Sequence, residues 1–453
     1  MGSGEAVFPS SFAWGTATSA PQSEGGIENS DWRIQERAGR VPVSGKTGDK
    51  WALYDEDFFR LSELGLLHHR TSLEWSRIEP EKGVYNREAI ENYRIMMETA
   101  QRRGITLWIS LHHVSFPAWF ARLGGFMDEA SIMYWHRFVE LVAKELGRFA
   151  DYWIPVHEPV SYAAGSYLLG IFPPFKKRMD KFTDMLVKVH RAHGDAYRIL
   201  KAYLPAQAKV GMAANITPVH PLDPESDADR IASEFVDSFI NRIPLDALRE
   251  GAVSVPGKGA VEIPSCKGAA DFLGIDYFTR LLVSRDSRLE GDDCLATLGK
   301  IEGMPGISAF REGELVSEVG FGSYPSGIYD AIKRAHRSGL ETPIYITASG
   351  VATGDEEARV DYIHKCLKGV YRALEQGLDV RGYFHWSDVD TFEWTRGYDA
   401  HYGLFAFDPL SLERRERPAA SFLSGVARGR ILTDGDLEKP GDPASDLSSV
   451  PGG

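Results

Sequence analysis

Short apolar runs alternate with amphipathic stretches along most of the chain. Runs of apolar and β-branched residues predict strands at 12–17, 69–75, 106–111, 153–159, 210–215, 271–278, 343–348 and 381–386. Apolar positions at helical spacing predict helices at 54–66, 90–100, 133–149, 182–193 and 360–370. About eight strand and helix units in this order predict an α/β fold, a (β/α)8 TIM barrel. We expect it to form a single domain over residues 1–430.

The composition bounds the size and the partners of the protein. With 453 residues, 43% of them hydrophobic and 25% charged, the chain can bury a large core. Residues 431–453, rich in Asp, Pro, Ser and Gly, are predicted to be a flexible C-terminal tail. A formal net charge of -13 argues against nucleic acid and anionic membranes as partners, and it leaves a homo-oligomer open.

Targeting and metal signals are weak in the sequence. No apolar run reaches the roughly 18 residues of a membrane span, and the start has no signal-peptide pattern, so we expect a cytoplasmic protein. Three widely spaced cysteines, Cys266, Cys294 and Cys366, predict reduced thiols rather than a disulfide framework or a zinc site. We therefore expect no metal and no cofactor.

The run 153–159 places one carboxyl group where a barrel enzyme carries its chemistry. Glu158 lies at the end of this predicted strand, and Pro159 cannot continue the ladder. Side chains at that end of a parallel barrel meet the substrate. Apolar neighbours such as Trp153 would raise the pKa of Glu158 toward that of a general acid. The alternative is a carboxylate that only caps the following loop.

The ends of the other predicted strands carry polar and aromatic residues as well. Since strand ends converge at one opening, aromatic faces and hydrogen-bonding groups there suit a neutral polyhydroxylated ligand. The set predicts a saccharide site and comprises Gln22, Arg70, Glu74, His113, His157, Glu158, Asp276, Tyr277, Trp386, Glu393 and Trp394.

Four motifs resemble glycoside hydrolase family 1, the β-glucosidase family. They are FAWGTATSAPQSEG at 12–25, EWSRI at 74–78, FLGIDY at 272–277, and RGYFHWSDVDTFEW at 381–394 followed by Gly397 and Tyr398. The matches run in the family's order from about residue 8 to residue 408. The resemblance implies a retaining β-glycosidase barrel, a hydrolase of the EC 3.2.1 class.

The resemblance also implies roles for individual residues. Glu158 would be the general acid and base. The glycone would be held by Gln22, His113, Trp386, Glu393 and Trp394. We add the neighbouring His157 to this substrate-binding set. A carboxylate at Glu393 would repel a phosphate, which argues against a sugar 6-phosphate.

The sequence departs from the family at the second carboxylate. A retaining enzyme needs a nucleophile across from its acid, and the family's motif for it is Thr-Glu-Asn-Gly. Here the corresponding residues read Thr-Ala-Ser-Gly, with Ala348 at the nucleophile position. Three further departures are His157 and Asp276 where the family has asparagine, and Val114 where it has tryptophan. An engineered substitution and natural divergence both explain Ala348, and four departures favour divergence.

Several mechanisms remain open without that nucleophile. Arg70 and Tyr277 would line a small hole beside Ala348, and a small anion such as azide or formate is expected to enter it and partly restore cleavage. Asp276, His157 or Glu74 would instead position water for inversion. Tyr277 would otherwise attack directly, or the substrate would supply a 2-acetamido oxygen.

The expected function is that of a β-glycosidase acting on a β-glucoside or related neutral β-glycoside or oligosaccharide. Hydrolysis would be impaired or would follow a modified mechanism. One alternative is a non-catalytic saccharide-binding protein. Another is a non-hydrolytic or transglycosylating enzyme on a glycosylated metabolite. The retention of Glu158 favours catalysis, since burying an acid is costly for a pure binder.

Overall fold

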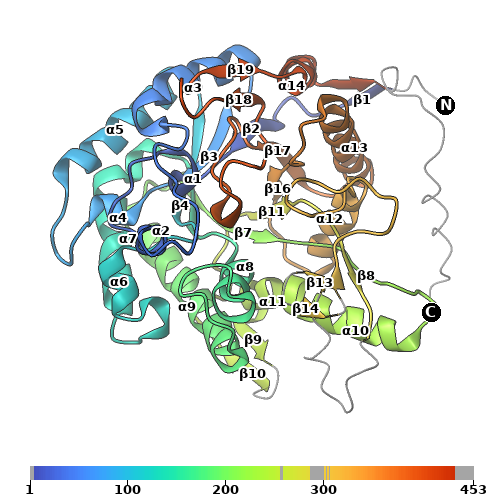
Figure 1. Ribbon diagram of the computed structural model, residues 1–453, viewed down its shortest axis with the longest axis horizontal. Helices are drawn as coiled ribbons and strands as arrows, with labels where there is room; N and C mark the ends of the chain where they lie inside the picture. Colours follow the sequence, from blue (N-terminus) through green and yellow to red (C-terminus); the bar gives the residue numbers. More distant parts are fainter. Residues whose placement is uncertain (1–4, 256–258, 286–299, 302–303, 306, 434–453) are drawn as a thin grey trace.

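The computed structural model describes residues 5–255, 259–285, 300–301, 304–305 and 307–433 (Figure 1). The predicted tail at 431–453 lies outside this range except for its first three residues. Those residues form the short strand β20 (Ile431–Thr433), which pairs antiparallel with β1 (Glu5–Val7). The two ends of the described chain are therefore held together.

Nine parallel strand segments form the central sheet. Their order is β6-β5-β4-β3-β2-β17-β16-β11-β7. The segments are β2 (Ala13–Ala17), β3 (His68–Ser72), β4 (Thr106–His112), β5 (Tyr152–Val156), β6 (Lys209–Val210), β7 (Met212–Asn215), β11 (Leu273–Tyr277), β16 (Ile344–Ser349) and β17 (Val380–Trp386). This sheet confirms the predicted α/β barrel.

The barrel closes at Gly211. β6 and β7 lie on either side of this glycine and occupy the two ends of the strand order. Together they therefore act as one strand of the barrel. β5 pairs with β6, and just beyond β5 the residue His157 forms a bridge with Ala213 of β7. The nine segments therefore form a closed barrel of eight strands, in which β6 and β7 count as one.

Helices cover the outside of the ring (Figure 1). They bury one apolar face each against the strands, as Tyr93, Met97 and Ala100 do in α5. Neighbouring helices also pack on one another, α7 on α9 and α12 on α13. The main covering helices are α3 (Lys50–Leu64), α5 (Arg87–Arg102), α7 (Ile132–Leu146), α9 (Met179–Tyr203), α12 (Gly327–Arg337), α13 (Glu356–Glu375) and α14 (Pro418–Gly429).

An aromatic layer fills the amino end of the barrel. Trp108 stacks on Tyr152 with ring centroids 3.7 Å apart. Phe272, Tyr345 and Phe384 meet the same indole edge-on, at 4.8 to 5.0 Å. Because this end is packed, a ligand has to enter from the carboxyl ends of the strands, where barrel sites lie.

Helices also occur in a connection for which no helix was predicted. The long connection after β7 contains α10 (Asp227–Asp237), the π-helical segment η4 (Ser238–Arg242) and α11 (Ile243–Glu250). The π-helical segment changes the residue spacing, which hides a single helical period across this stretch. Among the helices described, none combines the length and apolar character that crossing a membrane requires.

Candidate active site

Glu158 stands at the open end of the barrel, directly after β5. The strand ends at Val156, and the backbone turns at Glu158 with a φ of 45°, in the left-handed region. Pro159 then starts the short helix α8 (Pro159–Ala164). The Glu158 amide donates to the carbonyl of Ala213 at 2.8 Å, which fixes this turn against β7. A side-chain-bearing residue with positive φ is costly and marks functional positions.

The Glu158 carboxyl group is a weak acid in this setting. Its pKa is raised to about 8, chiefly by burial and next by the negative charge of Asp276. At pH 7 the group therefore holds a proton that it can give to a leaving group.

Asp276 is the centre of a buried polar cluster on β11. Its Oδ2 lies 2.9 Å from His157 Nε2 and 3.8 Å from Arg70 Nη2. Its Oδ1 accepts a hydrogen bond from Thr347 Oγ1 at 2.6 Å. Burial opposes ionisation, but the His157 and Arg70 charges and these hydrogen bonds hold the pKa of Asp276 below its ordinary value. Asp276 is therefore the ionised partner of Glu158.

Ala348 lies next to Asp276 on the neighbouring strand. The two residues are register partners in the pairing of β11 with β16, and the pairing shifts just before them. The Ala348 side chain is buried in the barrel interior with Trp386 and Tyr402. A methyl group cannot attack a sugar, so the position carries no chemistry of its own.

Tyr277 does not face Ala348. Its hydroxyl donates to the Tyr324 carbonyl, on the outer side of the barrel near the start of α12. Adjacent strand residues point to opposite faces, so Asp276 faces inward and Tyr277 outward. This corrects the expectation that Arg70 and a tyrosine hydroxyl line a hole there, because Arg70 faces the Asp276 carboxylate instead.

Four rings lie nearly parallel across the opening. His113 stacks on His157 with centroids 4.1 Å apart and a 14° angle. Its ring plane is also within 7° of Trp386, at 6.2 Å, and within 17° of Trp394, at 6.4 Å. The structure thus brings together the aromatic residues that the sequence assigned to the glycone. Parallel faces of this kind suit the C–H side of a sugar ring.

Glu393 and Gln22 join the same group. Glu393 Oε1 accepts hydrogen bonds from Trp386 Nε1 at 3.3 Å and from Thr391 Oγ1 at 2.6 Å. Burial raises the pKa of Glu393 to about 7. The backbone carbonyl of Gln22, in α1 (Ala20–Ser23), accepts from the Phe392 amide at 3.0 Å. Gln22 and Glu393 therefore sit on segments that are bonded to each other.

Glu74 is used elsewhere. It caps α4 (Trp75–Ile78), where its carboxylate accepts from the Ser76 amide at 3.0 Å and lies 3.3 Å from Ser115 Oγ. These contacts give Glu74 a structural role and remove it from the groups that could position water beside Ala348.

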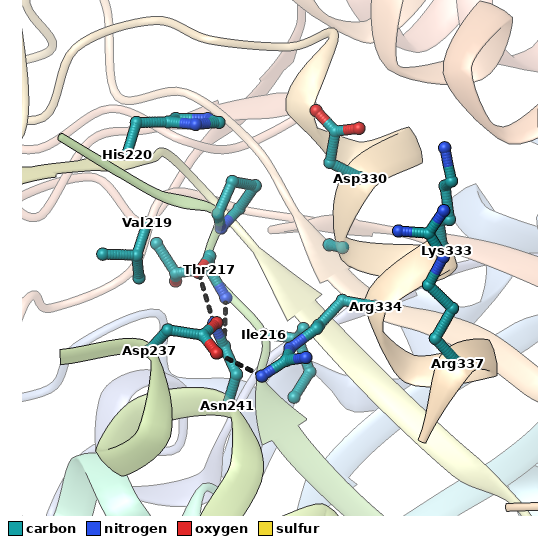
Figure 2. A pocket seen from close by; sticks show the side chains of 12 residues that line it. Ile216, Thr217, Val219, His220, Asp237, Asn241, Asp330, Lys333, Arg334 and Arg337 are labelled. Atoms are coloured by element: carbon teal, nitrogen blue, oxygen red, sulfur yellow. Dashed lines mark hydrogen bonds and ion pairs between the residues drawn. The ribbon is translucent and has the colours of Figure 1, made fainter. Parts of the chain in front are cut away.

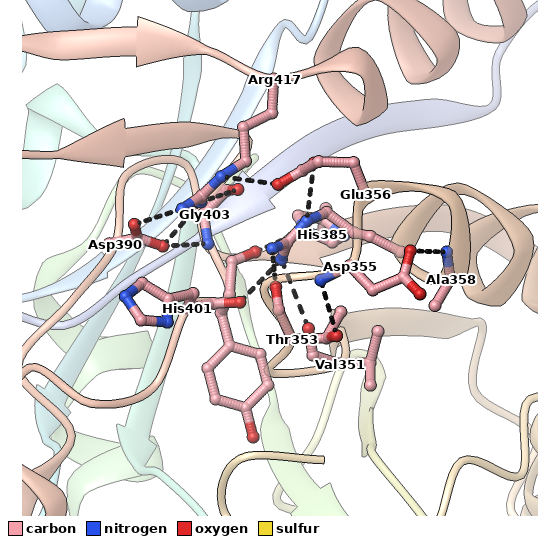
Figure 3. Close-up of polar contacts among 12 residues, drawn as sticks. Val351, Thr353, Asp355, Glu356, Ala358, His385, Asp390, His401, Gly403 and Arg417 are labelled. Atoms are coloured by element: carbon pink, nitrogen blue, oxygen red, sulfur yellow. Dashed lines mark hydrogen bonds and ion pairs between the residues drawn. The ribbon is translucent and has the colours of Figure 1, made fainter. Parts of the chain in front are cut away.

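An ionic network holds the loop that carries Glu393 and Trp394 (Figure 3). Arg417 makes two parallel hydrogen bonds to Asp390, at 2.8 and 2.7 Å, and its Nε lies 3.0 Å from Glu356 of α13. The Gly403 amide donates to the same aspartate at 2.8 Å. The sequence gives no sign of this network, because its members are far apart along the chain.

Three of the site residues have the composition of a metal site. His157, Glu158 and Asp276 each offer one ligand atom, and these atoms lie within 4.8 Å of one another. The Arg70 guanidinium, 3.8 Å from Asp276, opposes a cation at this place. A protonated Glu158 would also have to lose its proton first. The charges therefore favour an acid and carboxylate pair over a metal centre.

A separate hollow of about 210 Å³ lies between η4 and α12 (Figure 2). Arg334 contacts Asp237 there, and Asn241 bonds to the backbone of Thr217. Its lining contains none of the residues that the sequence assigned to the site. This hollow is therefore separate from the site that the sequence predicted at the barrel opening.

The closed parallel barrel and its polar, aromatic opening define an α/β-barrel protein with its site at the strand ends. A sequence model of Glycosyl hydrolase family 1 matches residues 4–430, which is nearly the whole chain. The protein therefore belongs to glycosyl hydrolase family 1.

Known proteins of similar length agree with this assignment. The beta-galactosidase of Pyrococcus woesei is 26% identical, over 94% of this chain and 98% of its own. A 6-phospho-beta-galactosidase of Staphylococcus haemolyticus is also 26% identical, over 94% and 99%. The solved structure of a beta-glycosidase from Pyrococcus horikoshii is 34% identical, with a TM-score of 0.85 over 95% of this chain and 96% of that one.

Proposed function

We propose that the protein is a β-glycosidase that cleaves a neutral β-glycoside, with Glu158 as the general acid and base. The observation that carries this proposal is the protonated Glu158 carboxyl group at the open end of the barrel, with a pKa of about 8. A general acid needs a proton at working pH and a place beside the leaving group. Relatives whose names are beta-galactosidase and beta-glycosidase support the same reaction class.

The glycone pocket proposed for this enzyme consists of Gln22, His113, His157, Trp386, Glu393 and Trp394. Its rings would pack on one face of the sugar, and Glu393 would accept hydrogen bonds from hydroxyl groups. Glu393 adds negative charge as it ionises, and Arg70, which lies 5.3 Å from the Trp386 ring centroid, faces Asp276. This charge pattern favours a neutral sugar over a 6-phosphate, although one relative is named for a phosphorylated substrate.

The test is Glu158→Gln, assayed on aryl β-glucosides with good and poor leaving groups. Glutamine keeps the shape of the side chain but cannot protonate the leaving oxygen. We expect cleavage of a phenyl glucoside to fall by about 100-fold or more, whereas release of a dinitrophenolate in the first turnover should change little. Glu357→Gln, at an exposed position on α13, is the matched control. An equal loss on both substrates would argue against an acid role.

A saccharide-binding protein without turnover is the second candidate, favoured by the methyl group at Ala348. Such a protein would bind glucosides with the same affinity before and after Glu158→Gln, because it uses no proton transfer. Calorimetric titration of wild type and variant with a β-glucoside, next to the cleavage assay, separates the two functions. Measurable wild-type turnover that depends on Glu158 excludes the pure binder.

A further inference from the structure

A carboxylate is present beside Ala348, but it is attached to the neighbouring strand. Asp276 of β11 is the register partner of Ala348 in β16, and a shift in the pairing places Thr347 against the Asp276 carboxylate. Arg70 binds both strands, since its Nε donates to the Thr347 carbonyl at 3.0 Å while Nη2 lies 3.8 Å from Asp276. The positive charge of Arg70 therefore stabilises a negative charge on Asp276 at this point of the barrel wall.

The two carboxyl groups are closer to each other than the two groups of an inverting enzyme are. Oxygen atoms of Glu158 and Asp276 lie within 4.8 Å of each other. Retaining glycosidases separate their two carboxyl groups by about 5–5.5 Å, whereas inverting enzymes need roughly 6.5–9.5 Å to fit a water molecule. The gap here is too short for a positioned water, so the arrangement favours direct attack.

The charges are also distributed as this chemistry requires. The Arg70 guanidinium and the Thr347 hydrogen bond favour the ionised form of Asp276, and Glu158 keeps its proton. Two ionised carboxylates at this distance would repel each other strongly in a buried site. A glutamate at position 348 would have added a further negative charge next to Asp276. Relative to the family pattern, Ala348 and Asp276 therefore act as a matched pair of substitutions: the carboxylate is lost from β16 and gained on β11.

His157 belongs to the same change. Its Nε2 lies 2.9 Å from Asp276 Oδ2, and its ring is fixed by stacking on His113. The imidazole lies against this oxygen and so limits the positions that the carboxylate can take. Three departures from the family pattern, at positions 157, 276 and 348, thus meet within one cluster.

We propose that Asp276 is the nucleophile of this enzyme and replaces the missing carboxylate of position 348. The inference rests on the proposed β-glycosidase function. An Asp276 oxygen bonds to the anomeric carbon as the glycosidic C–O bond breaks, and the leaving oxygen takes the proton of Glu158. Water then gives a proton to Glu158 and attacks the same carbon, which releases Asp276 and a sugar of retained configuration.

The decisive experiment traps the covalent intermediate in the wild-type protein. A 2-deoxy-2-fluoro-β-glucoside with a dinitrophenyl leaving group forms the glycosyl-enzyme but hydrolyses it slowly, and mass spectrometry of peptides locates the sugar. We expect the label on Asp276, and we expect NMR of the normal reaction to show retention. A label on another residue, inverted product, or turnover that gives no labelled peptide would overturn the role of Asp276.

Variants provide the second measurement. Asp276→Asn should lower kcat by roughly 10³-fold or more while the protein still binds glucoside, and Asp379→Asn, at an exposed position, should leave it unchanged. In Asp276→Gly, azide should restore cleavage and yield the α-glycosyl azide. Equal acceleration of the wild type by azide would overturn the inference, because the position would then already lack its carboxylate.

The two proposals fail in different ways. Turnover that depends on Glu158 but survives Asp276→Asn overturns only the role of Asp276. A wild type that cleaves no β-glycoside overturns the β-glycosidase function and the nucleophile with it. If Asp276→Asn does not fold, Ala348→Glu combined with Asp276→Asn returns one carboxylate to β16, and trapping in the wild type still decides the case.

Discussion

At the scale of single residues, the site depends on which of two close carboxyl groups keeps its proton. Glu158 and Asp276 have oxygens within 4.8 Å of each other, and His157 Nε2 lies closer to Asp276, at 2.9 Å, than to Glu158, at 3.9 Å. Arg70 Nη2 lies 3.8 Å from Asp276. Neither Arg70 nor Asp276 reaches solvent to any extent, so their charges act at low dielectric. The pair therefore divides into one acid and one anion, the division of roles that glycoside cleavage needs.

This division predicts a pH profile. Glu158 has to be protonated to act, so kcat/KM should fall as the pH rises through about 8, the raised pKa of this group. The negative charge of Asp276 is one cause of that raised pKa, so Asp276→Asn should move the alkaline limb to lower pH. The measurement is kcat/KM from pH 5 to pH 10 with both proteins. An unmoved limb would mean that the two groups do not interact.

At the scale of secondary structure elements, the loop after β17 depends on contacts with distant elements. Arg417, just before α14, joins Asp390 in this loop to Glu356 at the start of α13. Asp390 and Arg417 are mostly buried, with 7% and 11% of their side chains exposed. Their pairing fixes the segment that leads to Glu393, so it links the outer helices to the glycone pocket.

Breaking this ion pair should affect stability and binding together. Arg417→Met leaves the Asp390 carboxylate buried without its partner, which should cost about 3–5 kcal/mol in the free energy of unfolding. Urea denaturation measures this loss, and KM for a β-glucoside should rise as Glu393 loses its support. Adding Asp390→Asn removes the unpaired charge and should recover part of the stability. A loss in the double variant equal to the sum of the single losses would contradict a direct interaction.

The sequence predicted the strands of the barrel better than it predicted the site. All eight predicted strands exist, and most of them are short apolar runs of the kind that buried parallel strands have. α12 and the α10 to α11 segment were not predicted, although α12 has a clear helical period, with Ile328, Ala331, Ile332 and Ala335 buried on one face. Alternation along β11 would have placed Tyr277 outside once Asp276 was placed inside. The meeting of Asp276 with Ala348 depends on a pairing shift that no local pattern reveals.

At the scale of the whole molecule, every site residue depends on closure of the ring. The Glu158 amide donates to the carbonyl of Ala213 in β7, the strand that follows Gly211. Gly211 lets the chain pass close to Phe272, since a Cβ at this position would lie 2.4 Å from the Phe272 carbonyl oxygen. That approach joins β7 to β11, and so joins the segment of the acid to the segment of Asp276.

Gly211→Ala should therefore destabilise the whole barrel. The methyl group would meet backbone that cannot move without opening the sheet, so we expect a loss of about 1–3 kcal/mol, the usual cost of overpacking. Gly425→Ala in α14 is the matched control, because a Cβ there meets nothing within 4 Å. That change should be neutral or should stabilise by about 0.5–1 kcal/mol, since alanine favours a helix. Urea unfolding of both variants measures the difference in the free energy of unfolding. Equal stability of the two variants would mean that the barrel accommodates a methyl group at position 211.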